Sequence, residues 1–243
     1  MNTTTVWTPN ARPTSSGGSI GGCRWLFSAF AALAVCFPAA AVEPAKDAKN
    51  VVFSEDFESP SEARERLELL DPETWRFTEA DGNGVLEITE RGSAYKPPHR
   101  SPGHIALIRD LEVGNCEIQF RVRSTKDTGN HRDCCIFFGY QDAAHFYYVH
   151  LGAKPDPHSG QIMLVDEAPR KALTDNKALT PWDDEWHEVL LRRNIDTGKI
   201  DVYFDDMSSP HMSVTDRTFG AGRVGIGSFD DMNAFDDLTV STF

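Results

Sequence analysis

The chain has 243 residues, of which 40% are hydrophobic and 25% are charged, with 18 glycines and 14 prolines. These values are typical of a soluble globular protein and exclude a disordered, collagen-like or multi-pass membrane chain. Lysine and arginine total 24 against 37 aspartate and glutamate residues, so the formal net charge is −13. The sequence lacks the excess of basic residues with which proteins bind phosphate backbones, so we expect no nucleic acid partner.

Residues 1–41 have the features of a signal peptide. Arg12 and Arg24 precede an apolar run at residues 25–37, which is followed by Pro38 and three alanines. This order resembles a secretory signal, with cleavage expected after Ala41, and predicts a secreted or periplasmic protein without a membrane span after cleavage. Two alternatives remain open. An uncleaved anchor would need an apolar core of about 20 residues, and a lipoprotein would use the lipobox-like residues 33–36 (LAVC), in which valine stands where a small residue is preferred.

Export would change both the net charge and the chemistry of the cysteines. Removal of residues 1–41 takes away two of the 24 basic residues and none of the 37 acidic ones, so the net charge changes from −13 to −15. Cys116, Cys134 and Cys135 would then enter an oxidising compartment. Adjacent strand residues point to opposite faces, so at most one of Cys134 and Cys135 can face Cys116. Either Cys116 forms a disulfide with one of them, or all three are buried thiols; no cysteine or histidine spacing indicates zinc.

One helix is expected near the start of the folded domain. Ser59 is followed by Pro60 and, three positions after the serine, by Glu62, which together predict a capping box with proline at the first helical position. The helical pattern continues to Leu70. The proline at position 72 ends it, because the residue before a proline is disfavoured in the helical conformation.

The rest of the chain has the two-residue period of β-strands. We expect a polar linker at 42–50 and a single domain at 51–243, without a repeat or a second linker. About a dozen antiparallel strands separated by glycine, proline and asparagine turns predict an all-β sandwich or barrel. The predicted strands are 51–57, 85–89, 105–108, 116–122, 134–140, 146–151, 162–165, 188–193, 200–204, 224–227 and 238–242.

Several short segments resemble one known superfamily. They are Trp75, 52–58 (VFSEDFE), 81–86 (DGNGVL), 186–193 (WHEVLLRR), 200–206 (IDVYFDD), 225–227 (GIG) and 234–240 (AFDDLTV). These segments are similar to the concanavalin A-like lectin/glucanase jelly roll, and most similar to the laminin-G-like and 3-keto-disaccharide hydrolase-like domains of exported bacterial proteins. The resemblance implies an all-β, two-sheet antiparallel jelly-roll sandwich with one short N-terminal helix. This fold hosts lectins, glycosidases and lyases, so it does not imply one activity.

The chemistry expected on this scaffold follows from which residues share a strand face. The E-x-D-x-x-E motif of the retaining glucanases of this fold is absent from the sequence. If Ile118 faces the core, then Glu117, Gln119 and Arg121 share the opposite face of their strand. If Val149 faces the core, then Tyr148 and His150 share the opposite face of theirs. Should the two strands be neighbours, these side chains would line one groove, which predicts His150, Tyr148, Arg121 and Glu117 as catalytic and Gln119 as substrate-binding. The alternative is a solvated sheet face whose charges pair across strands.

Aromatic side chains are the second indication of a glycan site, because sugar rings stack their C–H faces on tyrosine and tryptophan. Tyr95, Trp182 and Tyr203 are the candidates for substrate binding. Trp75 and Trp186 are instead expected to fill the core at the start of a strand, as the resemblance implies.

Calcium is the one cofactor that the resemblance implies. Jelly rolls of this kind often join the first strand to the last through Ca²⁺, which prefers oxygen ligands. The candidate ligands are Glu55 and Asp56 near the start of the domain and Asp236 near its end, with Glu58 and Asp237 beside them.

The sequence therefore predicts an exported jelly-roll protein that binds or processes poly- or oligosaccharide in the manner of a glycoside hydrolase. A non-catalytic lectin-like or adhesive module is the first alternative, and a polysaccharide lyase acting on uronates is the second. The resemblance to 3-keto-disaccharide hydrolase-like domains favours processing, but no catalytic motif of that group maps onto the sequence.

Overall fold

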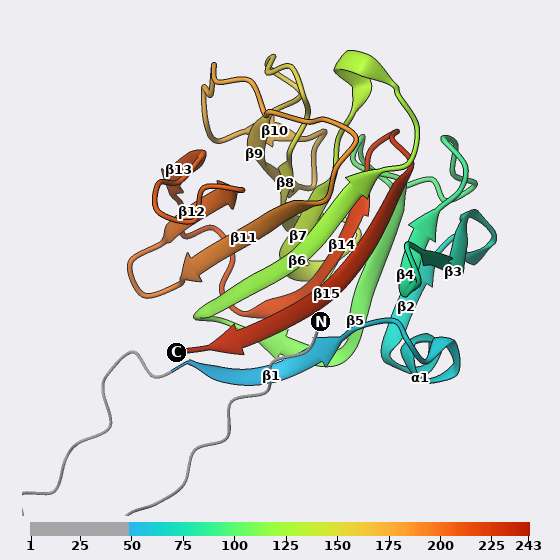
Figure 1. Cartoon of the computed structure of the whole chain (residues 1–243). Coiled ribbons are helices and arrows are strands. Elements are labelled where there is room, and N and C mark those ends of the chain that lie inside the picture. The colour runs from blue at the N-terminus through green and yellow to red at the C-terminus, as the bar shows by residue number, and fades with distance from the viewer. Residues whose placement is uncertain (1–48) are drawn as a thin grey trace, which may run out of the picture. The chain divides into compact units, whose positions relative to one another are not determined.

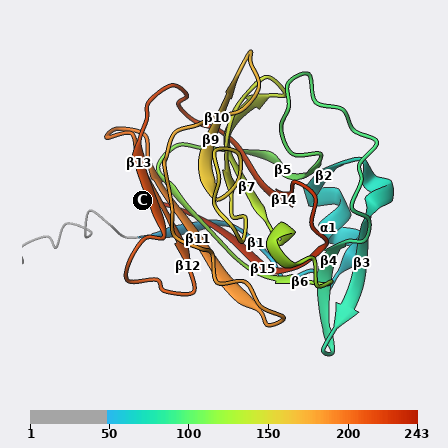
Figure 2. The same cartoon turned by 90° about the horizontal axis from the view of Figure 1, so that it is seen from above.

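Two antiparallel β-sheets make up most of the described part of the chain (Figures 1 and 2). The structure, a computed structural model, describes residues 49–243; the predicted signal peptide and most of the linker lie outside the described residues. The eight-stranded sheet has the order β13 (Met212–Thr215), β12 (Lys199–Phe204), β11 (His187–Asn194), β6 (Cys116–Ser124), β15 (Asn233–Thr242), β4 (Asn83–Ile88) and β3 (Trp75–Ala80), with β1 (Asn50–Glu55) also paired to β15. The seven-stranded sheet has the order β10 (Lys171–Ala172), β9 (Gln161–Asp166), β8 (His145–His150), β7 (Cys135–Asp142), β14 (Gly222–Ser228), β5 (His104–Val113) and β2 (Leu67–Leu70).

The last strand holds the two ends of the domain together. β15 pairs with β1 over its second half and with β4 at Ala234 and Phe235, and a register shift at residues 236–239 separates the two halves. Figure 1 shows β1 and β15 side by side. The β3–β4 hairpin closes through Asp81 and Gly82, both at positive φ (57° and 83°), as a two-residue turn matching the twist of its strands requires.

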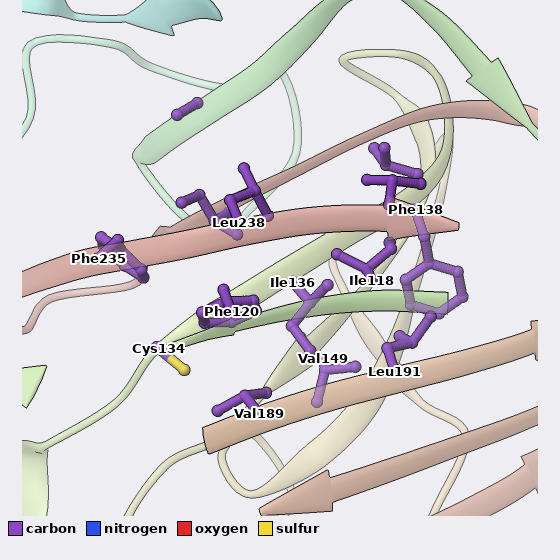
Figure 3. Packing of buried hydrophobic residues seen from close by; sticks show 14 of the residues in the cluster. Ile118, Phe120, Cys134, Ile136, Phe138, Val149, Val189, Leu191, Phe235 and Leu238 are labelled. Carbon is purple, nitrogen blue, oxygen red and sulfur yellow. The ribbon is translucent and has the colours of Figure 1, made fainter. Parts of the chain in front are cut away.

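The main core lies between the two sheets. Alternate residues of β6, β11 and β15 point inward and meet alternate residues of β7 and β8, as Figure 3 shows for Phe120, Val189, Phe235, Ile136 and Val149. The predicted inward orientation of the even-numbered residues of β6 and of Val149 is therefore confirmed. The two sheets pack face to face because each buries one apolar face against the other, and the predicted jelly-roll sandwich is the observed architecture.

The outer face of the seven-stranded sheet is also apolar. We call this second group the outer cluster; Tyr95, Leu70, Ala172 and Phe229 cover part of it. Both faces of this sheet are therefore occupied by apolar side chains, whereas the outer face of the eight-stranded sheet is polar. The outer cluster consists of Ile105, Leu107, Cys135, Phe137, Tyr140, Phe146, Tyr148, Met163 and Val165.

The predicted helix is shorter than its sequence pattern. α1 spans Pro60–Arg66 with Ser59 at the N-cap, but the serine side chain makes no capping hydrogen bond, so the predicted capping box is not formed. The predicted continuation to Leu70 is wrong: Leu67–Leu70 is β2, which pairs with β5. Tertiary pairing overrides the local helical pattern here, because as a strand Leu67 reaches the main core and Leu70 the outer cluster.

Each of the predicted strands is present, but β5 ends five residues later and β15 begins five residues earlier than predicted, and four strands were not predicted. These are β2, β3, β10 and β13. Within residues 49–243, no helix is long and apolar enough to cross a membrane.

All three cysteines of the described part are buried and free. Cys116 and Cys134 belong to the main core, and Cys135 belongs to the outer cluster, so the adjacent cysteines face opposite ways as predicted. The alternative of three buried thiols is the one that the structure adopts. Burial raises the pKa of Cys116 to about 12 and the pKa values of Cys134 and Cys135 well above the usual thiol range.

These thiols should be inert in the folded protein, because thiolate is the reactive species and all three sites disfavour it. We expect Cys116, Cys134 and Cys135 to resist a disulfide-exchange reagent at mildly alkaline pH and to react together once guanidinium chloride unfolds the domain. Labelling followed by intact-mass measurement checks this. Rapid labelling of any of the three in the folded state, or a native mass lower by two hydrogens, would contradict it.

Candidate functional site

The two strands predicted to share a groove lie in different sheets. β6 lies between β11 and β15 in the eight-stranded sheet, whereas β8 lies between β7 and β9 in the seven-stranded sheet. Gln119 and Arg121 therefore share a surface, but Tyr148 and His150 belong to another part of the molecule. The predicted convergence of Arg121, Tyr148 and His150 is not present, because strand parity fixes the face of a side chain and not the sheet to which its strand belongs.

Gln119 and Arg121 line a hollow on the polar outer face of the eight-stranded sheet, which we call the Trp186 groove. Its volume is about 480 Å³, and Trp186, Glu188, Asp205 and Asp237 are among its other lining residues. β11 pairs with β6 in a register that places Glu188 opposite Arg121 and Leu190 opposite Gln119. Gln119 Nε2 donates to Glu188 Oε1 at 2.5 Å, and Arg121 Nη1 lies 3.4 Å from Asp237 Oδ2.

Trp186 is half-buried and lines this groove. The guanidinium carbons of Arg121 and Arg123 lie 5.0 and 4.9 Å from its ring centroid. The next residue, His187, points inward, where its Nδ1 lies 2.9 Å from Asp205 Oδ2 and its ring packs against Phe204. The two arginines therefore fix the position of the Trp186 ring at the surface.

The expectation that Trp75 and Trp186 both fill the core is right for one residue and wrong for the other. Trp75 is 1% exposed and belongs to the main core. Trp186 faces out, because Val189 and Leu191 face inward and the two-residue period then places His187 inward and Trp186 outward. The same alternation, counted back from the strand predicted at 188–193, would have identified Trp186 as an exposed aromatic residue.

The other residues predicted to act on a substrate lie apart from this groove or beneath the surface. Glu117 is 4% exposed and binds Arg192 and Lys49, at 2.6 and 2.5 Å. Tyr203 is 8% exposed on β12, opposite Leu190. Tyr95 covers the outer cluster, and Trp182 packs against the main core while its indole Nε1 donates to the carbonyl of Leu151 at 2.7 Å.

Tyr148 is inside the outer cluster. Its side chain is fully buried, and its hydroxyl has no hydrogen-bond partner among the described residues. Burial raises its pKa well above the usual tyrosine range. The catalytic role of Tyr148 stays a prediction. The buried position of its hydroxyl does not support that role.

The predicted calcium ligands are engaged with protein donors. Glu55 Oε2 accepts from Arg66 at 2.7 Å, Asp56 Oδ1 accepts from the amide of Glu58, and Asp236 Oδ2 accepts from Asn83 at 2.5 Å. Within the described part of the chain, no group of three or more acidic, histidine or cysteine side chains is arranged to hold a metal ion. Calcium binding by these residues stays a prediction, and backbone pairing of β1 with β15 already joins the first strand to the last.

A second hollow lies at the end of the sandwich where β6, β8 and β14 end. We call it the arginine pocket; its volume is about 420 Å³. Four permanently cationic side chains line it, together with three histidines and three carboxylates. The cationic residues are Arg100, Arg132, Lys154 and Arg170, the histidines are His131, His150 and His158, and the carboxylates are Asp133, Asp156 and Asp230.

Asp133 and His150 form the inner wall of the arginine pocket. His150 Nε2 lies 3.6 Å from Asp133 Oδ2, and His150 Nδ1 lies 3.0 Å from the carbonyl oxygen of His158. Both ring nitrogens thus face protein acceptors. The imidazole stacks on Phe229, with ring centroids 5.5 Å apart and planes 19° from parallel.

The buried carboxylates beneath the pocket have pKa values shifted in opposite directions. Burial alone would raise the pKa of Asp133, but the nearby charge of His150 and hydrogen bonds from the Phe229 amide and Ser228 outweigh it, so the pKa lies below its ordinary value. Burial raises the pKa of Asp231 to about 6, and the nearby charge of Asp133 adds to this, although Thr128 and Ser124 donate hydrogen bonds to it.

The pocket is assembled from loops, so sequence periodicity gave no sign of it.

The chain has the two-sheet antiparallel jelly-roll fold that the sequence resemblance implied. No protein-family model and no curated protein matches its sequence.

Among solved structures, the carbohydrate-binding module CBM66 from Bacillus subtilis is similar with a TM-score of 0.52 at 12% identity, covering 72% of this chain and 95% of that chain. The winged bean acidic lectin, in complex with methyl-α-D-galactose, has a TM-score of 0.52 at 12% identity, over 79% and 98% of the two chains. Domain 4 of AbnA, a GH43 extracellular arabinanase from Geobacillus stearothermophilus, in complex with arabinotriose, has a TM-score of 0.50 at 8% identity, over 80% and 93%. At these identities the similarity establishes the fold alone.

The raised pKa of Asp231 predicts a pH dependence of stability. A carboxyl whose pKa is about 6 when folded and 3.8 when unfolded takes up a proton on folding between those pH values, so its contribution to the free energy of unfolding increases as the pH falls. We expect the wild type to gain about 2 kcal/mol relative to Asp231→Asn between about pH 7 and pH 4.5.

Denaturant titrations of both proteins across this range measure that difference. The difference between the two proteins is the informative quantity, because burial lowers the pKa values of His104 and His211 and their contributions to stability decrease in both proteins as the pH falls. A difference that stays flat with pH would show that Asp231 has an ordinary pKa in the folded protein.

Proposed function

We propose that the protein binds carbohydrate, and that it does so in the Trp186 groove. The observation that carries the proposal is a half-exposed tryptophan surrounded by amide, carboxylate and guanidinium side chains on the polar face of a β-sheet. The C–H face of a sugar ring stacks on an indole, and its hydroxyls pair with such polar groups. The fold that this chain shares with a carbohydrate-binding module and a lectin agrees with this function but does not carry it.

The groove is prearranged for this role. Gln119, Arg121 and Glu188 project from neighbouring strands whose register is fixed by the backbone ladder, so their polar atoms need little reordering on binding. Arg121 and Arg123 fix the orientation of the indole through cation–π contacts, each of which contributes about 0.5–1 kcal/mol at an exposed site. A sugar would therefore meet a rigid surface.

Binding without cleavage is the form of the proposal that the geometry favours. The four residues predicted as catalytic are divided between two sheets, Tyr148 is buried in the outer cluster, and Glu117 is neutralised by Arg192 and Lys49. General acid–base catalysis needs its acid and its base within reach of one substrate. The lectin-like alternative needs only the aromatic platform and its polar neighbours.

We further propose that the domain acts outside the cytoplasm after removal of residues 1–41. The signal-like features of residues 1–41 carry this proposal. The three remaining thiols are compatible with it, because burial protects them from oxidation. Expression of the full chain in a bacterium with Sec-dependent export, followed by N-terminal sequencing of the periplasmic protein, is expected to yield Val42 as the first residue. A protein that keeps its first residues, or one that carries lipid on Cys36, would contradict this cleavage.

Trp186→Ala should abolish most of the affinity for neutral oligosaccharides. The stacking surface is lost while the core residue His187 stays in place, so we expect affinity to fall about tenfold or more, with little change in thermal stability. Trp186→Phe, which keeps an aromatic platform, should retain affinity to within about threefold. A glycan array followed by isothermal titration calorimetry of the best neutral ligand measures both effects.

Arg76→Ala serves as the matched control for this experiment, because Arg76 is exposed on β3 and its guanidinium bonds only to backbone carbonyls. It should leave affinity unchanged. Equal affinity of the wild type and Trp186→Ala for every neutral glycan bound would exclude the Trp186 groove as the binding site.

A further inference from the structure

The arginine pocket has a positive surface within an acidic domain. The chain carries a net charge of −13, yet four permanent cations converge on this hollow from four separate loops. Arg100 belongs to the β4–β5 connection, Arg132 to the β6–β7 connection, Lys154 to the β8–β9 connection and Arg170 to the β9–β10 connection. Arg132 forms ion pairs with Asp127 and Asp184, so Arg100, Lys154 and Arg170 are the cations of the pocket without an ion pair among the described residues. Like charges that converge in this way attract an anion.

The carboxylates of the pocket do not neutralise its two central arginines. Asp133 accepts hydrogen bonds from Ser228 and from the Phe229 and Asp230 amides, and Asp230 pairs with Arg91. Asp156 accepts from the His158 amide. Within residues 49–243, no carboxylate forms an ion pair with Arg100 or Arg170, and the Nε and Nη1 atoms of Arg170 are buried without a hydrogen-bond partner.

Phe229 orients these two guanidinium groups. The guanidinium carbon of Arg170 lies 4.3 Å from the Phe229 ring centroid and that of Arg100 lies 5.6 Å from it, while the His150 ring stacks on the same phenyl group. The backbone amide of Arg170 also donates to the carbonyl of Arg100 at 3.3 Å, which joins the two loops. Arg170 thus keeps its charge beside aromatic rings without a carboxylate partner among the described residues, and a guanidinium group pairs with carboxylate or phosphate groups in a bidentate arrangement.

We propose that the arginine pocket is a second ligand site, which binds the carboxylate of a uronate residue in an acidic glycan. Arg170 and Arg100 pair with the carboxylate, and the apolar edge of Phe229 meets the sugar ring. Asp133 and His150 hold the aromatic wall and do not touch the ligand. The volume of about 420 Å³ lies within the range of small-molecule sites. The identification of the ligand as a sugar rests on the proposed function. The existence of an anion site rests only on the cations of the pocket.

Calorimetry with digalacturonate, the matched neutral digalactoside and a sulfated galactose disaccharide tests this proposal. The wild type is expected to bind digalacturonate, and Arg170→Gln is expected to weaken that binding about tenfold to a hundredfold, because it removes the charge from two paired donors. Arg100→Gln, at a more exposed position, provides a second variant should the first not fold, and it should weaken binding in the same direction. Arg76→Gln removes one remote positive charge and should change affinity less than about twofold.

Three results would overturn the proposal: equal binding of the neutral and acidic disaccharides, tighter binding of the sulfated disaccharide than of digalacturonate, or equal weakening by Arg76→Gln and Arg170→Gln. Trp186→Ala separates this proposal from the proposed function. If digalacturonate binds while no neutral glycan does, the Trp186 groove fails and the uronate site stands. If neutral glycans bind through Trp186 while digalacturonate shows no preference over its neutral match, the uronate site fails alone.

Discussion

The loops at one end of the molecule are held together by hydrogen bonds to the buried carboxylate of Asp133. It is 2% exposed and accepts hydrogen bonds from Ser228 and from the Phe229 and Asp230 amides, while its own backbone carbonyl accepts from Asn233 Nδ2 at 2.7 Å. These bonds join the segment before β7 to the turn between β14 and β15. A buried charge without such partners would be strongly destabilising, so Asp133 requires the loop arrangement that places Phe229 and His150 in the wall of the arginine pocket.

The two sheets differ in what their outer faces can do. Apolar residues fill both faces of the seven-stranded sheet, and parts of its connecting loops cover the outer cluster, so a ligand is left with the loop-built pocket at the strand ends. The eight-stranded sheet has one apolar face and one polar face, and its polar face carries the Trp186 groove. The location of both sites follows from this distribution, because an antiparallel sheet with one solvated face can offer side chains directly to a ligand.

Sequence periodicity was sufficient for the elements that alternate regularly and insufficient for their assembly. The inward orientation of Ile118 and Phe120, the opposite orientations of Cys134 and Cys135, and the shared surface of Gln119 and Arg121 all follow from the two-residue period. Sheet membership does not, because pairing of β6 with β11 and β15, and of β8 with β7 and β9, depends on contacts between residues distant in sequence. The arginine pocket draws its residues from several loops, whose order along the chain gives no periodic signal. The outward orientation of Trp186, in contrast, could have been predicted from the same two-residue period that located the core.

The central claim is that two chemically different ligand sites lie on one jelly roll, a neutral-sugar groove at Trp186 and an anion pocket at Arg170. Nuclear magnetic resonance of the purified protein, following the indole Nε1–H of Trp186 and the guanidinium Nε–H of Arg170, tests it most directly. A neutral oligosaccharide should shift the Trp186 signal and leave that of Arg170 in place, whereas a uronate disaccharide should shift the Arg170 signal. Signals that stay unmoved with every ligand, or that move together regardless of the charge of the ligand, would contradict the account.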